Sequence, residues 1–337
     1  MSTYVYPSNS ELQLLAQEKL PVLTQDDPIF GEMPIVDVDA HLLEWEQQDN
    51  YIGLQQVRGL NNQFSRVKAI GGKRFRLEPG IYGEYAPVDE EALTVRRQFG
   101  TFNTPIRISD LVVEKQDQLL NRRIDRIRYI GWTLLATGTF SVSNPDGTVT
   151  HTDAYTTQTF DAAVGWGTVA TATPLGDFRA IKLKQRGKGC SFGAQAKAYM
   201  NQTTFNNMIA NTNSADLYGK RTSGLANVLS LADANAVLLG EDLPQVVIYD
   251  EGYLNDSGAF QLFIPNNVVV VVGRRPGGQK IMDYAMTRNA NNPNLAPGAY
   301  MDVFESQKPP KTIEVFDGHN GGPRMYYPSA VVIADVS

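Results

Sequence analysis

One long amphipathic segment constrains the fold of this chain more than any other feature. Ser109 can cap the start of a helix and Gly138 can end it. Between them, apolar residues return at helical spacing, at Leu120, Ile124, Ile127, Ile130 and Leu134. The helix would span roughly 40 Å, whereas a typical helix has only about 11 residues. With one apolar stripe, such an element has to lie across a broad surface of the protein.

Charged side chains gather on another face of the predicted helix. They are Arg122, Arg123, Asp125 and Arg126. The simplest interpretation is the solvated side of an ordinary core helix. Contact with nucleic acid is an alternative for the three arginines. The helix alone does not distinguish these two interpretations, so the rest of the sequence is needed.

The composition bounds the class of protein. The chain has 337 residues, 42% of them hydrophobic, which is enough for a substantial core. Its formal net charge of -6 argues against a protein that grips nucleic acid by neutralising phosphates. The single cysteine, Cys190, rules out an internal disulfide. We expect no secretory signal, no membrane span and no membrane partner, because no stretch approaches the necessary ~18 apolar residues.

The chain begins with a segment that resembles an arm. Residues Glu11–Lys19 predict one short helix with Leu12, Leu15 and Ala16 on its inner side, followed by prolines and acidic residues. Because a short helix is not stable alone in water, it must dock on something. Its own body and a neighbouring copy are both possible, and we favour the neighbour.

A two-stranded excursion precedes the long helix. Pro34–Trp45 alternates apolar and polar residues, and Phe64–Leu77 continues as strand with a break at Gly71–Gly72. A turn follows at Glu78–Gly80. An isolated hairpin is marginal in water, so we expect this one to need a partner surface. It is the first indication of assembly.

The remainder predicts short helices and many strands. A hairpin is expected over Thr139–Val149 around an Asn-Pro-Asp-Gly turn, and Val268–Val272 reads as a strand covered on both faces. We interpret residues 274–310 as rich in loops. The other expected elements are helices Asp177–Gln185 and Gln202–Asn211, and strands Ser191–Tyr199, Leu243–Asp250, Ala259–Ile264, Thr312–Phe316 and Met325–Ile333. The class is α+β.

Catalytic motifs are weak in this sequence. Gly189–Gly193 matches the G-x-S-x-G nucleophile elbow, with Ser191 as the nucleophile. That motif requires a strand before the serine and a helix after it, and here the order is reversed. The three histidines have no companions at metal-ligand spacing. We therefore expect no enzyme activity, no catalytic residue, no metal and no cofactor, and keep a serine hydrolase only as a remote alternative.

The order of elements resembles the major capsid proteins of tailed bacteriophages, which have the Hong Kong ninety-seven fold. More narrowly, the chain is similar to the phage lambda major head protein (capsid protein E) family. The stretches that carry the resemblance are GGKRFRLEPGIYGEY, VRRQFGTFNTPIRISD, GTFSVSNPDG, PNNVVVVVGRRPGG and RMYYPSAVVIADV. The resemblance covers nearly the whole chain and rests on the order of the predicted elements and on the residue patterns of these stretches.

The resemblance implies a division into named parts. These are an N-arm at 1–33, an extended E-loop at 34–93, a P domain at 94–211 with its spine helix at 109–138, an A domain at 212–309, and P-domain strands at 310–337. The arginines would then meet acidic E-loop residues of a neighbour. The candidate inter-subunit contacts are Arg122, Arg123, Arg126, Lys73, Arg74, Arg76, Glu84 and Glu90.

The resemblance also implies the function and the partners. The chain would form hexamers and pentamers of an icosahedral head that encloses double-stranded DNA without sequence-specific binding. A separate scaffolding protein, a portal and a decoration protein would be its other partners. It would be assembled in the host cytoplasm and reside in the virion capsid. A cellular nanocompartment shell with the same fold is the alternative.

Overall fold

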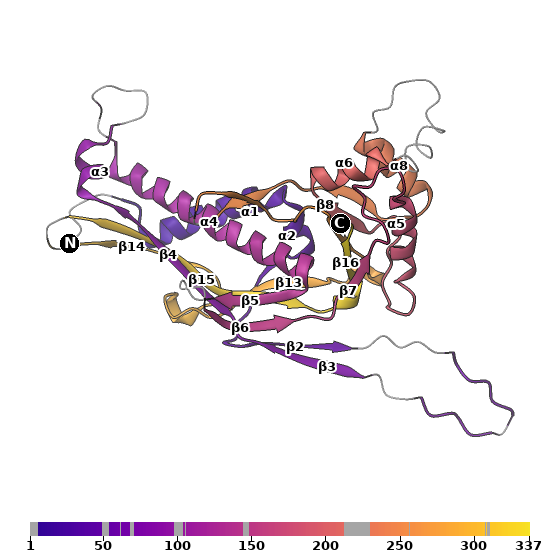
Figure 1. Cartoon of the computed structure of the whole chain (residues 1–337). Coiled ribbons are helices and arrows are strands. Elements are labelled where there is room, and N and C mark those ends of the chain that lie inside the picture. Colours follow the sequence, from indigo (N-terminus) through magenta and orange to yellow (C-terminus); the bar gives the residue numbers. More distant parts are fainter. Residues whose placement is uncertain are drawn as a thin grey trace. The chain divides into compact units, whose positions relative to one another are not determined.

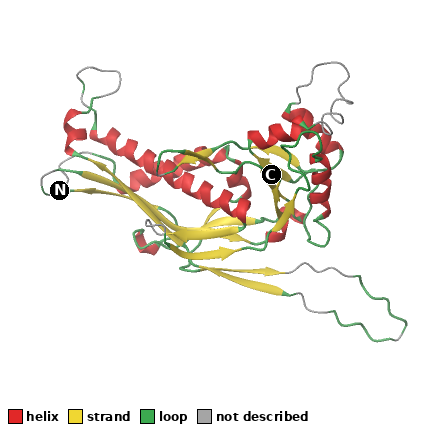
Figure 2. Ribbon diagram, in the orientation of Figure 1, coloured by secondary structure: helices red, strands yellow, loops and turns green. Residues whose placement is uncertain are grey.

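The structure is a computed structural model. It describes residues 6–48, 54–60, 62–67, 71–97, 104, 106–143, 148–211, 230–255, 257–306, 308 and 311–337. Helices and strands are mixed along the chain, which gives the α+β class expected from the sequence (Figures 1 and 2). The chain divides into two units. Unit 1 comprises residues 1–43, 77–131 and 283–324, and unit 2 comprises 44–76, 132–282 and 325–337.

The long helix is present almost as predicted. It is α4, Ile108–Thr137, so it starts before Ser109, and Ser109 is not its cap. The backbone N–H of Leu111 instead bonds to the Arg107 carbonyl at 3.2 Å. The end is the expected one: Gly138 has φ +72°, and its N–H bonds to the Leu134 carbonyl. Residues up to Gly131 belong to unit 1 and the last turns to unit 2.

A sheet built around one long strand forms the other layer of unit 1. The strand β15, Ile313–Met325, pairs antiparallel with β4, Gly80–Val88, and with β14, Tyr300–Glu305. The sheet continues through β13, Met282–Met286, to β1, Ile35–Asp37, which runs parallel to β13. Residues of α4 and of β4 and β15 share one apolar core, whose members include Leu111, Val112, Leu119, Ala86, Val88, Ile313 and Val315.

The N-terminal helix packs on its own unit, which corrects our preference for a neighbouring copy. It is α1, Asn9–Gln25, longer than predicted because Ser8 and Glu11 form a reciprocal capping box. Leu12 is fully buried in the core that α4 and the sheet share. The Lys19 ammonium lies 2.5 Å from the Asp117 carboxylate on α4. A second short helix, α2 (Pro28–Glu32), follows.

A mixed sheet forms the centre of unit 2. Its strand order is β7 (Gln158–Asp161), β16 (Val331–Asp335), β12 (Val268–Val272), β8 (Lys197–Met200), β9 (Gln245–Ile248). The predicted strand Val268–Val272 is confirmed, and it is covered on both faces, since Val269 to Val272 are fully buried. Residues from the helices α5 (Pro174–Leu183), α6 (Gln202–Ala210) and α8 (Leu231–Gly240) pack with Val269 and Val271.

Smaller elements complete the two units. Unit 2 holds three two-stranded pairs: β2 (Leu43–Gln48) with β3 (Gly72–Leu77), β5 (Thr139–Ser143) with β6 (Val149–Ala154), and β10 (Gly252–Leu254) with β11 (Phe260–Leu262). The short helix α3 spans Glu90–Val95, and 3₁₀ turns span Pro276–Gly278, Pro293–Leu295 and Pro328–Ala330. The predicted 139–149 hairpin is confirmed by its strands, and its turn at 144–147 lies outside the described residues.

Several predicted elements differ from the structure. The strand β4 was not predicted, and the stretch 274–310 contains β13 and β14 in addition to loops. The expected strand Ser191–Tyr199 is limited to β8, because turns occupy the residues before it. The strand expected at Leu243–Asp250 pairs parallel with β8, and the hairpin beside it consists of β10 and β11.

The two C-terminal strands also lie in different sheets. We expected them to complete one domain, but β15 pairs with β4 and β14, whereas β16 pairs with β7 and β12. The two units therefore divide the chain differently from the ranges 94–211, 212–309 and 310–337.

Candidate assembly surfaces

Sequence reasoning treated the arginines of the long helix as one charged face, and the structure divides them. Arg122 binds Glu84 of the same chain, with Nη2 to Oε1 at 2.7 Å, and both side chains are about half exposed. The hydrogen bond from Arg122 lowers the pKa of the Glu84 carboxyl. This pair joins α4 to β4 at the surface of unit 1.

Arg123 lies inside unit 1. It is only 8% exposed, and its guanidinium lies 3.0 Å from the carboxylate of Asp317 on β15. Burial raises the pKa of the Asp317 carboxyl to about 6, although the charge of Arg123 opposes the rise. A side chain buried in this way secures the helix to its own sheet, which corrects the expectation that Arg123 faces a neighbouring copy.

Arg126 lies at the edge of an aromatic cluster. Its guanidinium is 6.0 Å from the centre of the Tyr82 ring, and that ring stacks on His319. The His319 Nε2 and the Tyr284 hydroxyl are 3.0 Å apart. Burial lowers the pKa of His319 to about 3, with Arg123 and Arg126 acting in the same direction. The histidine is therefore a neutral core residue.

The basic residues predicted on the ribbon, β2 with β3, lie on its second strand. Arg74 binds Glu44 at 2.6 Å, and Arg76 approaches the same carboxylate at 3.9 Å. Lys73 is exposed and lines a shallow pocket with Gln47, Phe75, Thr156, Pro328 and Ser329. Glu90 is exposed in the first turn of α3. No described contact brings these residues together with the arginines of α4.

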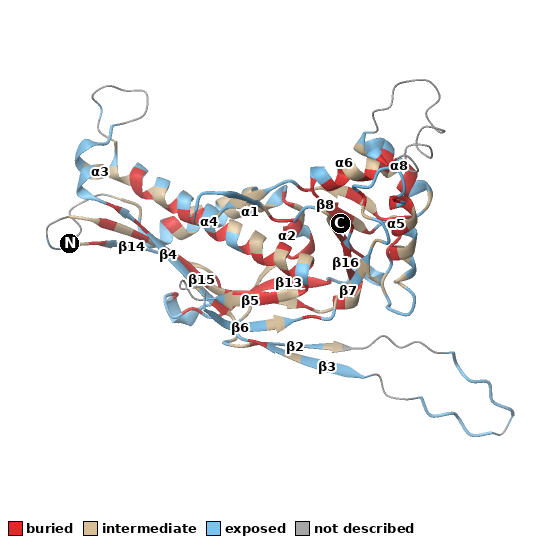
Figure 3. Ribbon diagram, viewed as in Figure 1, coloured by how far each residue is buried: buried red, intermediate tan, exposed pale blue. Residues whose placement is uncertain are grey.

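The clearest candidate surface lies on the two-stranded excursion that the sequence predicted to need a partner. Figure 3 shows the connection between β2 and β3 as exposed along its described residues, 54–60 and 62–67. Leu54, Val57 and Leu60 are 93%, 99% and 98% exposed, and Phe64 and Val67 are also exposed. Leu54, Val57 and Leu60 recur at every third position of the sequence. A set of nearly fully exposed large apolar residues marks an interaction site.

A family comparison decides what kind of assembly this is. The sequence model of the family described as phage major capsid protein E matches residues 38–315. The chain belongs to the phage major capsid protein E family. It is a structural protein of an icosahedral phage capsid. The comparison with curated proteins gives no match.

Solved structures share the fold at low sequence identity. The proposed capsid protein of a prophage in Escherichia coli CFT073 is similar over 96% of this chain and 99% of that one, with 12% identity and a TM-score of 0.60. A phage-related protein from Bordetella bronchiseptica RB50 is similar over 98% of both chains, with 10% identity and a TM-score of 0.54. The capsid of Myoviridae phage XM1 is similar over 89% of both chains, with 11% identity and a TM-score of 0.51. These confirm the Hong Kong ninety-seven fold.

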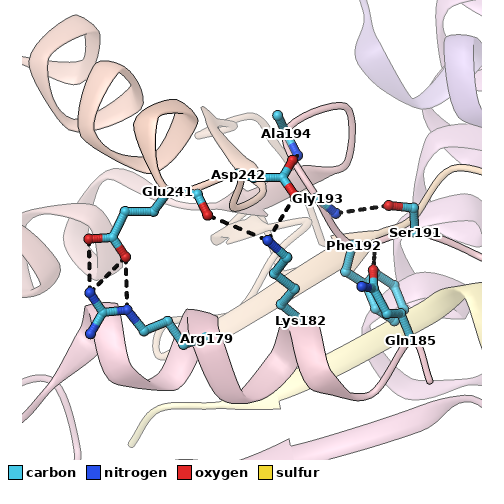
Figure 4. A network of polar contacts seen from close by, with 9 residues as sticks. All are labelled: Arg179, Lys182, Gln185, Ser191, Phe192, Gly193, Ala194, Glu241 and Asp242. Atoms are coloured by element: carbon cyan, nitrogen blue, oxygen red, sulfur yellow. Dashed lines mark hydrogen bonds and ion pairs between the residues drawn. The ribbon is translucent and has the colours of Figure 1, made fainter.

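The serine motif has a structural explanation in this capsid protein. Ser191 forms a backbone bridge with Arg274, and turns rather than a helix follow it. Its hydroxyl accepts a bond from the Gly193 N–H at 3.3 Å, while the Phe192 N–H bonds to Gln185 Oε1 (Figure 4). The strained strand-to-helix turn of a nucleophile elbow is therefore not the local geometry at Ser191.

The described part of the chain shows neither a metal-ligand cluster nor a membrane-spanning helix. Its residues contain no group of three or more potential metal-ligating side chains. Its helices include none that is both long and apolar enough to cross a bilayer.

Proposed function

We propose that this capsid protein assembles through pentamers and hexamers into a closed head around double-stranded DNA. One chain in many copies must bend differently at the two kinds of capsomer while it keeps its own fold. Membership of the capsid protein E family supports this assembly. We also propose assembly in the host cytoplasm with a separate scaffolding protein, a portal and a decoration protein as partners.

The observation that carries the proposal is the exposure of residues 54–60 and 62–67, which lie between β2 and β3. Burying one large apolar side chain is worth about 1.5–3 kcal/mol, so exposing several in one segment is unfavourable. Leu54, Val57, Leu60, Phe64 and Val67 gain that free energy only when another surface covers them. In a shell built from one kind of chain, a second copy supplies that surface.

The distribution of charge favours unit 1 of the second copy as that surface. Residues 44–76 contain six basic and three acidic residues, whereas the ranges of unit 1 contain 13 basic and 21 acidic ones. Complementary potentials fix register and suppress wrong contacts. We therefore assign the E-loop role to residues 44–76, within the predicted 34–93, and keep Lys73, Arg74, Arg76 and Glu90 as candidate contacts.

A variant of the ribbon tests this proposal. Replacing Leu54, Val57 and Leu60 together by serine should prevent closed shells, as seen by electron microscopy. The melting temperature of the unassembled chain should not change, because these residues are nearly fully exposed.

The matched control is a triple serine replacement of Leu183, Leu239 and Leu254, which are also exposed in unit 2. It should assemble normally. Normal shells from the ribbon variant would refute the role of the ribbon.

A further inference from the structure

Two basic loops lie side by side in unit 2. The first, residues 184–190, follows α5, and the second, residues 274–280, follows β12. The backbones of Ser191 and Arg274 bond to each other in both directions, at 2.8 and 2.9 Å, which joins the ends of the two loops. Burial raises the pKa of the Cys190 thiol, and the nearby charges of Arg275 and Lys188 oppose that rise. A cation from each loop therefore lies close to one sulfur atom. We call this surface the paired basic loops.

The paired basic loops form a positive region in an acidic protein. Their cations are Lys184, Arg186, Lys188, Arg274, Arg275 and Lys280. The sequence has no acidic residue between Asp177 and Asp216, or between Asp256 and Asp283. Arg186, Lys188 and Lys280 are exposed. The chain as a whole has a net charge of -6, so this concentration of positive charge is local.

Acidic side chains near the first loop are already occupied by the preceding helix. Figure 4 shows Arg179 of α5 in two hydrogen bonds to Glu241, each 2.8 Å long. Lys182 binds Asp242 at 2.8 Å, and Asp242 also accepts the N–H of Ala194 at 2.9 Å. These pairings balance the charges of α5. Glu241 and Asp242 are therefore engaged by residues of α5.

The second loop leaves open space for a ligand. Positive φ angles occur at Gly187 and Gly189 in the first loop and at Gly277 and Gly278 in the second. The turns are closed by backbone hydrogen bonds, from Lys188 to the Gln185 carbonyl at 3.0 Å and from Gly278 to the Arg275 carbonyl at 3.2 Å. A side chain built on Gly277 or Gly278 would meet nothing within 4 Å, so this backbone is open to a ligand.

We propose that the paired basic loops bind phosphate groups of double-stranded DNA. The inference rests on the proposed enclosure of DNA by the shell, and it makes this face of unit 2 a lumenal one. The composition of the loops, KQRGKGC and RRPGGQK, offers positive charge without large apolar anchors. That combination fits a uniform row of phosphates better than the mixed surface of an acidic protein segment, which gains specificity from buried anchors.

Salt-dependent binding to a short fluorescent DNA duplex tests the proposal. The wild-type chain should bind weakly at low salt, and the logarithm of its affinity should fall linearly with the logarithm of salt concentration. A variant with Arg186, Lys188 and Lys280 replaced by glutamine loses as many as three phosphate contacts. Its salt slope should therefore be smaller by about 2–3, at about 0.9 per contact.

A control variant separates a local site from general charge. Replacing Arg97, Lys115 and Lys308 by glutamine makes the same change in net charge within unit 1. It should keep the wild-type affinity and slope. Equal losses in both variants would overturn the proposal, as would undiminished DNA binding by the loop variant.

Two further measurements distinguish failure of the DNA-binding proposal from failure of the proposed function. Binding of polyglutamate but not of DNA by the wild-type chain would assign the loops to an acidic protein partner and overturn the proposal. Electron microscopy of the same preparations reports on shell formation independently. If the wild-type chain forms shells but does not bind DNA before assembly, only the role of the loops is rejected. A chain that forms no shell would reject the proposed function.

Discussion

At the residue scale, the ion pair of Arg123 and Asp317 connects the long helix of unit 1 to its central strand. The two residues are 194 positions apart, so no spacing rule in the sequence could have paired them. In the sequence, nothing distinguished Arg123 from the neighbouring arginines Arg122 and Arg126. Its burial depends on where β15 lies under α4, and the packing of the two elements decides that.

The pH dependence of stability tests this pair. Asp317 titrates near 3.8 when unfolded and near 6 in the fold, so the folded chain binds its proton more tightly. Its contribution to stability is full below about pH 4 and is lost as the pH rises through 6. Asparagine mimics the protonated acid. Relative to wild type, Asp317→Asn should therefore gain up to about 3 kcal/mol in free energy of unfolding between pH 4 and 7.

Urea unfolding of the unassembled chain across this pH range measures the difference. The comparison with wild type is essential because His319, with its lowered pKa, gives a slope of opposite sign. Subtracting the two curves removes that common contribution. A variant that gains no stability relative to wild type between pH 4 and pH 7 would contradict the raised pKa of Asp317.

At the element scale, the sequence predicted the helices and strands whose own residues show a clear periodicity or apolar run. The long helix, the helix at Gln202–Ala210 and the buried strand Val268–Val272 each carry their own periodicity or apolar run. The strand β4 contains Gly80, Gly83 and Pro87, which weaken a strand signal. It forms because β15 pairs with it over nine positions, and that partner lies more than 200 residues further along the chain.

The N-terminal helix also shows that the residues of one element do not predict its partner. Its apolar stripe was visible, but the surface that covers the stripe was not. Leu12 is fully buried against residues of α4, β4 and β15, and the Gln116 amide donates a hydrogen bond to the Leu12 carbonyl. The helix therefore belongs to the core of unit 1 before any assembly occurs.

Truncating that side chain tests the docking. Leu12→Ala should lower the free energy of unfolding of the unassembled chain by about 2–5 kcal/mol, because it leaves a cavity in a packed core. Leu14→Ala on the same helix should have little effect, since Leu14 is more than half exposed. Equal stability of the two variants in thermal or urea unfolding would indicate that α1 docks only on a neighbouring copy.

At the scale of the whole molecule, the sequence led to the capsid family and its fold through the order of its elements. The extended segment at 34–93 stays a prediction, and its first and last strands, β1 and β4, belong to the sheet of unit 1. The sequence also did not single out the apolar residues Leu54, Val57 and Leu60, which are nearly fully exposed in the structure. Exposure is a property of the folded chain, so the sequence alone does not show it.

The central claim is that this connection is stabilised only by a neighbouring copy. Hydrogen exchange followed by mass spectrometry, on peptides covering residues 54–67, tests it in unassembled chain and in purified shells. Exchange should be fast in the unassembled chain and become strongly protected in shells, while peptides from β12 stay protected in both. Slow exchange at 54–67 in the unassembled chain, or no added protection in shells, would contradict the account.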